Sequence, residues 1–300
     1  MSDQTQQLIS DVKKQDFAAL AKLLTVLERE GPGQLSLHPD LLHPRKLSFR
    51  VGITGPPGAG KSTLISKLIS ELRSRNFSVG VIAVDPSSPF SQGAVLGDRI
   101  RYTEHFSDSK VFIRSLGSRG SLGGLSASAY LMVRAFDLAE FDFVLIETVG
   151  VGQTELEIMN VADFVSVVLV PESGDSIQAM KAGLLEIADL FIVNKFDRPG
   201  AEGFKNELEL SLHLDPRPNA LQTKVMSMIA LQAQGIEEFW SHIETHLNSS
   251  DWKQKRISTE RLRSEAHALL RNQMERKISS ITAPIEGVDD LLKVLESNFK

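Results

Sequence analysis

The sequence contains no cysteine among its 300 residues. Disulfide bonds and thiolate metal sites are therefore excluded. No apolar stretch approaches the roughly 20 residues that a membrane-spanning helix needs, and the polar N-terminal residues lack the basic and apolar segments of a secretory signal. The formal net charge of −5 gives no general attraction to nucleic acid. We therefore expect a cytoplasmic protein that binds neither membrane nor nucleic acid.

Hydrophobic patterning divides the chain into three zones. Residues 1–46 carry apolar side chains at helical spacing, interrupted by turn signals at 31–33 and 43–44. Residues 47–247 alternate short apolar runs with longer amphipathic stretches. Residues 248–300 begin with a polar link at 248–251 and continue with a long charged helix at 259–281 and an amphipathic helix at 288–299. We predict a central domain with an N-terminal and a C-terminal helical extension.

The central zone reads as a three-layer α/β domain. Several strand candidates are apolar throughout, as in strands buried on both faces of a mostly parallel sheet. Helices between the strands would cover both faces. The predicted strands are residues 49–54, 79–84, 111–115, 143–147, 164–170, 190–193 and 224–230, and the predicted helices are 61–75, 123–139, 176–187, 201–213 and 236–247.

A phosphate-binding loop follows the first strand candidate, where the sequence matches G-x-x-x-x-G-K-[ST]. Glycines let the backbone curl so that N–H groups point at phosphate oxygens, and the helix that begins at Lys61 adds its positive end. We expect Lys61 to reach the β- and γ-phosphates and the Ser62 hydroxyl to bind Mg²⁺. A glycine-rich turn that binds nothing is the alternative. The predicted nucleotide contacts are Gly55, Pro56, Pro57, Gly58, Ala59, Gly60, Lys61, Ser62 and Thr63.

A guanine reader of the form N-K-x-D ends the strand candidate at 190–193. Asp197 can accept hydrogen bonds from N1 and the 2-amino group of guanine, and adenine offers neither donor there. The stem of Lys195 can lie along the base, and we expect Asn194 to tie the base loop to the phosphate loop. A helix-entry turn is the alternative. With the phosphate loop, the tetrad predicts a GTPase.

Metal and switch residues are expected at the tips of two other strands. Glu147 ends the strand at 143–147 and can hold Mg²⁺ directly or through water. Gly150 can offer its N–H to the γ-phosphate, a bond that hydrolysis would break. Gln153 is a candidate for orienting the attacking water, although it lies three residues beyond that glycine.

Two further carboxylates flank a Ser/Gly-rich loop that suits closure over Mg²⁺ and the γ-phosphate. These are Asp85, which could instead cap a turn, and Asp98, which could instead be a solvated loop acid. The candidate catalytic residues are Lys61, Glu147, Asp98 and Gln153.

These stretches closely resemble the MeaB/ArgK GTPases, the bacterial counterparts of the human methylmalonic aciduria type A protein. The resemblance runs from about residue 15 to 247 and is weaker in the tail. The sequences around Asp85 and Glu147 are its most specific parts. The matching stretches are residues 51–62, 83–88, 96–101, 122–125, 147–153, 174–175, 188–190 and 194–195.

The resemblance implies slow GTP hydrolysis that serves an adenosylcobalamin-dependent acyl-CoA mutase, typically methylmalonyl-CoA mutase, by gating cofactor loading and protecting the mutase. It implies homodimers built through C-terminal helices. It places Arg101 in a first switch, and it assigns coupling to the mutase to residues 172–181 with Gln178 and Lys181. The magnesium set that it implies is Ser62, Asp85, Asp98 and Glu147.

Two positions depart from the family pattern. Phe196 stands where alanine is usual, which should change packing beside the base and leave the polar reader intact. The Ser-Ala loop that contacts guanine O6 in the family is Ile229-Ala230 here. Only the backbone N–H of Ala230 would remain for that contact, so base affinity should be reduced.

Other functions fit the sequence less well than the mutase chaperone. Metal-delivery maturation GTPases usually carry Cys or His clusters for their cargo, and the absence of cysteine argues against this class. A kinase or ATPase linked to amino-acid transport is disfavoured by the guanine reader. A binding module without catalysis is disfavoured by Lys61, Ser62 and Glu147. The charged tail suits a solvated helix face or a partner surface.

Overall fold

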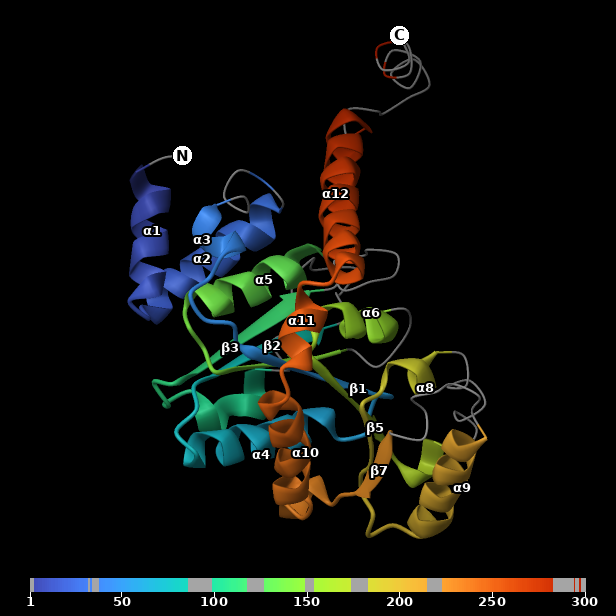
Figure 1. The fold of residues 1–300 in the computed structure, drawn as a ribbon. Coiled ribbons are helices and arrows are strands. Elements are labelled where there is room, and N and C mark those ends of the chain that lie inside the picture. The colour runs from blue at the N-terminus through green and yellow to red at the C-terminus, as the bar shows by residue number, and fades with distance from the viewer. Residues whose placement is uncertain are drawn as a thin grey trace.

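The computed structural model describes residues 3–31, 33, 38–85, 99–117, 127–148, 154–173, 183–214, 223–282, 294 and 297. At its centre lies a seven-stranded sheet in the order β3-β2-β4-β1-β5-β6-β7 (Figure 1). All neighbouring strands pair in parallel, so their carboxyl ends lie at one edge of the sheet. The strands are β1 (Phe49–Thr54), β2 (Val79–Asp85), β3 (Val111–Gly117), β4 (Phe143–Glu147), β5 (Phe164–Leu169), β6 (Leu190–Val193) and β7 (Lys224–Ser227).

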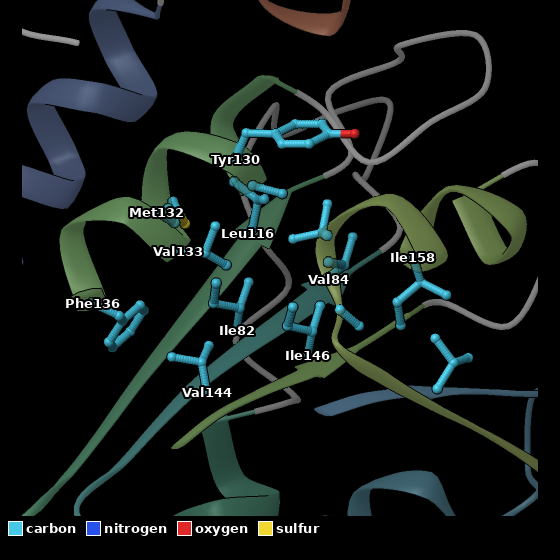
Figure 2. Close-up of a cluster of buried hydrophobic side chains, with 14 of the residues drawn as sticks. Ile82, Val84, Leu116, Tyr130, Met132, Val133, Phe136, Val144, Ile146 and Ile158 are labelled. Carbon is cyan, nitrogen blue, oxygen red and sulfur yellow. The ribbon is translucent and has the colours of Figure 1, made fainter. Parts of the chain in front are cut away.

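Helices cover both faces of the sheet. Successive strand residues point to opposite faces, so β2 and β4 feed two separate apolar cores. One face packs against α5 (Ala127–Leu138) and α6 (Thr154–Val161), and Figure 2 shows side chains of β2 and β4 meeting those of the two helices. On this side also lie α8 (Leu184–Ile187) and α9 (Ala201–His213). The other face packs against α4 (Lys61–Ser74) and α10 (Ile236–Asn248).

The N-terminal helices share the core of the α5 face. They are α1 (Asp3–Lys13), α2 (Phe17–Glu30) and the short α3 (Pro39–Leu42). Asp16 caps α2 by accepting hydrogen bonds from the N–H groups of Ala18 and Ala19 at 2.8 and 3.1 Å. The first residue of α2, Phe17, stacks on Phe141 with ring centroids 5.6 Å apart. The extension is therefore packed onto the central domain.

Buried ion pairs tie the C-terminal helices α11 (Asp251–Arg256) and α12 (Thr259–Thr282) to the sheet. Arg256 pairs with the fully buried Asp163, which immediately precedes β5, and Arg261 approaches the same carboxylate at 3.5 Å. Asp163 also accepts a hydrogen bond from the N–H of Arg50 in β1 at 2.9 Å. This cluster therefore holds the end of α11 and the first turn of α12 against the sheet, and removing one partner would leave buried charges uncompensated.

The structure confirms the three-layer fold with its two helical extensions, and it corrects several bounds. Helix α6 was not predicted. Residue 251, assigned to a polar link, begins helix α11. The last strand ends at Ser227, because Ala230 starts a short 3-10 turn, η5 (Ala230–Gln232). The predicted helix at 176–187 is described only as α8, and the one at 288–299 lies outside the described residues except for Val294 and Ser297. The division into three zones stays a prediction.

The buried cluster gives a stability prediction. Replacing Asp163 by alanine removes the nearest carboxylate of Arg256, which keeps only Asp137 at 3.8 Å, and the carboxylate that Arg261 approaches. We expect a loss of about 3 kcal/mol or more in the free energy of unfolding. Urea unfolding followed by circular dichroism measures the change. Asp251→Ala, at the exposed start of α11, is the matched control and should change the value by less than about 0.5 kcal/mol. Equal stability of the two variants would contradict the role given to Asp163.

Candidate nucleotide-binding site

The phosphate loop joins the end of β1 to the start of α4, and two of its glycines are required for different contacts. Gly55 has φ +135°, and a Cβ there would lie 2.0 Å from the carbonyl oxygen of Val168 in β5. Gly60 has φ +92°, and a Cβ there would lie 2.4 Å from Nδ2 of Asn194. Any side chain would therefore push the loop away from β5 or from Asn194.

Lys61 folds back over this loop. Only 6% of the residue is exposed, and its Nζ donates to the carbonyl oxygens of Gly55 at 2.7 Å and Pro56 at 3.1 Å. The N-cap residue of α4 is Gly60, which has no side chain to cap the helix, and the N-terminal end of α4 faces the same loop. An ammonium group and a helix N-terminus thus share one small region, which is the arrangement that suits phosphate oxygens.

Glu147 lies beside the loop at the end of β4, with 6% of the residue exposed. Its Oε1 accepts a hydrogen bond from the Ser62 hydroxyl at 2.7 Å, and its Oε2 accepts one from the hydroxyl of Tyr102 at 2.5 Å. The next residue, Thr148, donates to Oγ1 of Thr54 in β1 at 2.8 Å. A carboxylate and a hydroxyl side by side are the oxygen donors that Mg²⁺ prefers, so the described part of the site fits this ion.

The remaining metal and switch candidates are only partly described. Asp85 ends β2, which pairs with β4 through Ala83 and Glu147, so its backbone lies at the same sheet edge. The side chain of Asp85 lies outside the described residues, and so do Asp98, Gly150 and Gln153. Among the side chains that the structure describes, no three of His, Cys, Asp or Glu gather as a metal cluster.

The base loop is tied to the phosphate loop by Asn194, a buried residue directly after β6. Its Nδ2 donates to the carbonyl oxygen of Ala59 at 2.8 Å, and its Oδ1 accepts from the N–H of Ala230 at 3.0 Å. Lys195 has φ +56°, and its Nζ donates to the carbonyl oxygen of Gly58 at 2.7 Å. Asp197 is exposed. The structure thus brings the predicted phosphate and base loops into direct contact.

The two positions that depart from the family pattern lie in this base loop. Phe196 donates its N–H to the carbonyl oxygen of Met228 at 3.1 Å, and its ring packs against the core on the α5 face of the sheet. Ala230 begins η5, and its N–H is directed to Asn194. Asn194 therefore orients the backbone at the position where the family's Ser-Ala loop stands.

Two contributors to the site were missed by sequence reasoning. Tyr102 lies in η2 (Arg99–His105), one residue beyond the matching stretch at 96–101, and no motif marked it. Arg198, next to the base reader, pairs with Glu172 of η3 (Pro171–Ser173), the first residue of the predicted coupling segment. The hydrogen bond from Arg198 holds the pKa of Glu172 below its usual value. Gln178 and Lys181 of that segment lie outside the described residues, as does the side chain of Arg101.

The parallel sheet, the glycine loop and the helix that follows it define a P-loop nucleotide hydrolase. Comparison with known proteins narrows this class. Residues 20–283 match the family model "Methylmalonyl Co-A mutase-associated GTPase MeaB". A Pyrococcus abyssi protein named as a GTPase is 45% identical over 243 residues, covering 80% of this chain and 75% of its own. The mouse "Methylmalonic aciduria type A homolog, mitochondrial" is 33% identical over 277 residues, covering 84% and 67%.

A solved structure described as a LAO/AO transport system kinase aligns with a TM-score of 0.68 and 25% identity, covering 100% of this chain and 99% of that one. The chain therefore belongs to the MeaB family, and it is a GTPase that converts GTP to GDP and phosphate. None of the described helices is long and apolar enough to cross a lipid bilayer.

Removing the ammonium group tests the phosphate site. Lys61→Ala takes away the buried ammonium group that binds the carbonyl oxygens of Gly55 and Pro56, and we expect GTP hydrolysis to fall at least about 100-fold, since such positioned cations act on the transferred phosphoryl group. Phosphate release under single-turnover conditions measures the rate. Lys67→Ala, on the same helix away from the loop, is the control. A Lys61→Ala protein that hydrolyses GTP at the normal rate refutes the site.

Base selectivity tests the reader. Asp197→Asn replaces the double acceptor by an amide that matches the 2-oxo group of xanthine, and we expect preference for GTP over xanthosine triphosphate to relax or reverse. Competition binding of the two nucleotides measures the ratio. Glu202→Gln removes a nearby exposed acid in α9 and should leave the ratio unchanged. Unaltered selectivity in Asp197→Asn rules out this carboxylate as the guanine contact.

Proposed function

We propose that the chain uses Mg²⁺-dependent GTP hydrolysis to chaperone an adenosylcobalamin-dependent acyl-CoA mutase, methylmalonyl-CoA mutase or a relative, through cofactor loading and protection of the enzyme. The observation that carries this proposal is the match of residues 20–283 to a family described as mutase-associated GTPases. The likeness to the mouse methylmalonic aciduria type A homolog supports the same partner. We place this activity in the cytoplasm.

Ser62 and Glu147 hold the magnesium ion in this proposal, with Asp85 and Asp98 completing the set. The 2.7 Å hydrogen bond between Ser62 and Glu147 supports it, because the serine can keep this bond while its oxygen faces a cation. Bound Mg²⁺ supplies charge neutralisation to the β- and γ-phosphates. Lys61 orients the phosphates from the side of the loop, Gly150 binds the γ-phosphate, and Gln153 orients the attacking water.

The guanine base is held by Asn194, Lys195 and Asp197, with the backbone of Ile229-Ala230 beside it. The contact between Glu172 and Arg198 supports a link from this base loop to the coupling segment at 172–181. Both side chains of the pair are about half exposed, so it adds little stability and serves to orient the segment. Glu172 thus stands where the nucleotide site can influence a surface for the mutase.

A homodimer through α12 is the second part of the proposal. One face of α12 is anchored to the body: Arg261 donates to the carbonyl oxygens of Met159 and Ala162 at the end of α6, and Glu265 pairs with Arg134 of α5 at 2.6 Å. The opposite face exposes large apolar side chains at intervals of four or eight residues, a stripe suited to pairing with a second copy. These residues are Leu262, Leu270, Met274 and Ile278.

Two other functions find less support. A metal-delivery GTPase needs a cargo site, and the chain has no cysteine and no described cluster of metal-binding side chains. The structure described as a LAO/AO transport system kinase is the observation that favours a transport-linked kinase. The guanine reader and the family description favour GTP hydrolysis coupled to a mutase over that reading.

Nucleotide-dependent complex formation tests the partner. The tagged protein, loaded with a non-hydrolysable GTP analogue or with GDP, is mixed with purified adenosylcobalamin mutases, starting with methylmalonyl-CoA mutase. We expect the amount of co-purified mutase to differ at least about fivefold between the two nucleotide states, which is a coupling free energy of about 1 kcal/mol. The Lys61→Ala variant should lose this dependence. Failure of every such mutase to bind in any nucleotide state contradicts the chaperone proposal.

The dimer is tested by a charge on the apolar stripe. Leu270 is 57% exposed, so Leu270→Glu should leave the protomer folded and shift the protein from dimer to monomer. Light scattering after size exclusion at several concentrations measures the mass. Ser279→Glu adds the same acid to α12 off the stripe and should remain dimeric. A wild-type protein that is monomeric at high concentration removes this part of the proposal.

A further inference from the structure

The buried hydroxyl of Tyr102 is directed at the carboxylate that we assign to magnesium. Tyr102 is fully buried, and its hydroxyl donates to Oε2 of Glu147 at 2.5 Å. The other carboxylate oxygen, Oε1, accepts from Ser62 at 2.7 Å. A buried hydroxyl needs a partner, and here the partner is an acidic group at a strand tip beside the phosphate loop. The two hydroxyl groups thus each donate to a different oxygen of the Glu147 carboxylate.

We propose that Tyr102 is a positioning residue of the magnesium site, one whose hydroxyl holds the Glu147 carboxylate with Oε1 on Ser62, in an orientation from which the carboxylate would bind Mg²⁺. This inference rests on the proposed role of Glu147 in binding Mg²⁺. A glutamate has three rotatable side-chain bonds, and a fixed donor on Oε2 removes much of that freedom before the metal arrives. Hydrogen bonds of this kind around a metal ligand typically change metal affinity 10- to 100-fold.

The tyrosine ring is itself held in place, so the hydroxyl is aimed by packing. It belongs to the same apolar core as Leu64 and Leu68 of α4. Beside it, His105 of η2 contacts α4 through its Nε2, which lies 2.9 Å from the Ser66 hydroxyl. Burial lowers the pKa of His105 below its usual value. Segment η2 is therefore packed against α4. This packing positions Tyr102, whose hydroxyl in turn orients the Glu147 carboxylate.

The position of Tyr102 adds a connection between two parts of the site. Segment η2 begins at Arg99, directly after the predicted metal ligand Asp98, whereas Glu147 belongs to β4. The hydroxyl thus joins the chain that follows one proposed ligand to the side chain of another. Loss of the hydroxyl should weaken Mg²⁺ binding while leaving the phosphate and base contacts intact.

The experiment measures how Mg²⁺ tightens binding of a fluorescent GDP analogue. Tyr102→Phe removes only the hydroxyl, and we expect the Mg²⁺ concentration for half of the effect to rise about tenfold. Affinity for the analogue with chelator present should stay within about twofold, because contacts that do not involve the metal are kept. The chain has one other tyrosine, the buried Tyr130, and Tyr130→Phe should match the wild type. Tyr102→Met, a second variant without the hydroxyl, should give the same shift.

A double-mutant cycle separates this inference from the proposed metal site. Glu147→Gln should raise the Mg²⁺ requirement, and Tyr102→Phe should add nothing in that background. If Glu147→Gln shifts the requirement and Tyr102→Phe does not, the role of Tyr102 is overturned and the metal site stands. If Glu147→Gln has no effect, the metal role of Glu147 fails first. An equal loss of affinity with and without Mg²⁺ in Tyr102→Phe also overturns the inference, since it marks a purely structural role.

Discussion

A single buried amide sets the distance between the two halves of the nucleotide site. Asn194 follows β6 directly, and its side-chain amide bonds to both loops. It donates to the carbonyl oxygen of Ala59 in the phosphate loop and accepts from the N–H of Ala230 in the base loop. Gly60 must lack a Cβ for this amide to approach. Lys195 adds a second bond between the loops, from its Nζ to the carbonyl oxygen of Gly58. Since Asn194 contacts both loops directly, we expect phosphate and base recognition to depend on each other. A ligand must satisfy both spacings at once, and we propose that a guanosine nucleotide does so.

The parallel sheet also brings the acidic residues to the edge where the phosphate loop lies. Because β1, β2 and β4 run in one direction side by side, the phosphate loop and the acidic residues that end β2 and β4 meet there. The described part of this edge is the hydrogen bond between Ser62 and Glu147, and the Tyr102 hydroxyl donates to the other carboxylate oxygen of Glu147. Behind the edge, α6 ends at carbonyl groups that Arg261 of α12 binds. The short helix α6 thus lies between the predicted switch residues, which precede it in the chain, and α12, the proposed dimer helix.

Sequence alone was sufficient where local physics decides. Runs rich in apolar residues, such as 49–54, 143–147 and 190–193, gave strand bounds that the structure repeats, because strands buried on both faces are mostly apolar. The buried Arg50 of β1 is tolerated because it pairs with Asp137. The phosphate loop and the base reader could be found in the sequence because the shape of the ligand fixes the spacing of residues within each motif. Helix α6 was missed because its face pattern is weak and it follows directly on the switch motif. Tyr102 was missed because only tertiary packing brings η2 to Glu147, and no local pattern marks such a contact.

Calorimetric titration of the purified protein with GTP, GDP and ATP, each with and without Mg²⁺, tests the central claim most directly. The account predicts heat of binding for both guanosine nucleotides, tighter binding when Mg²⁺ is present, and an affinity for ATP at least about 100-fold weaker, since adenine leaves the Asp197 carboxylate unpaired. A folded protein that gives no heat with GTP or GDP in the presence of Mg²⁺, or that binds ATP as well as GTP, contradicts it.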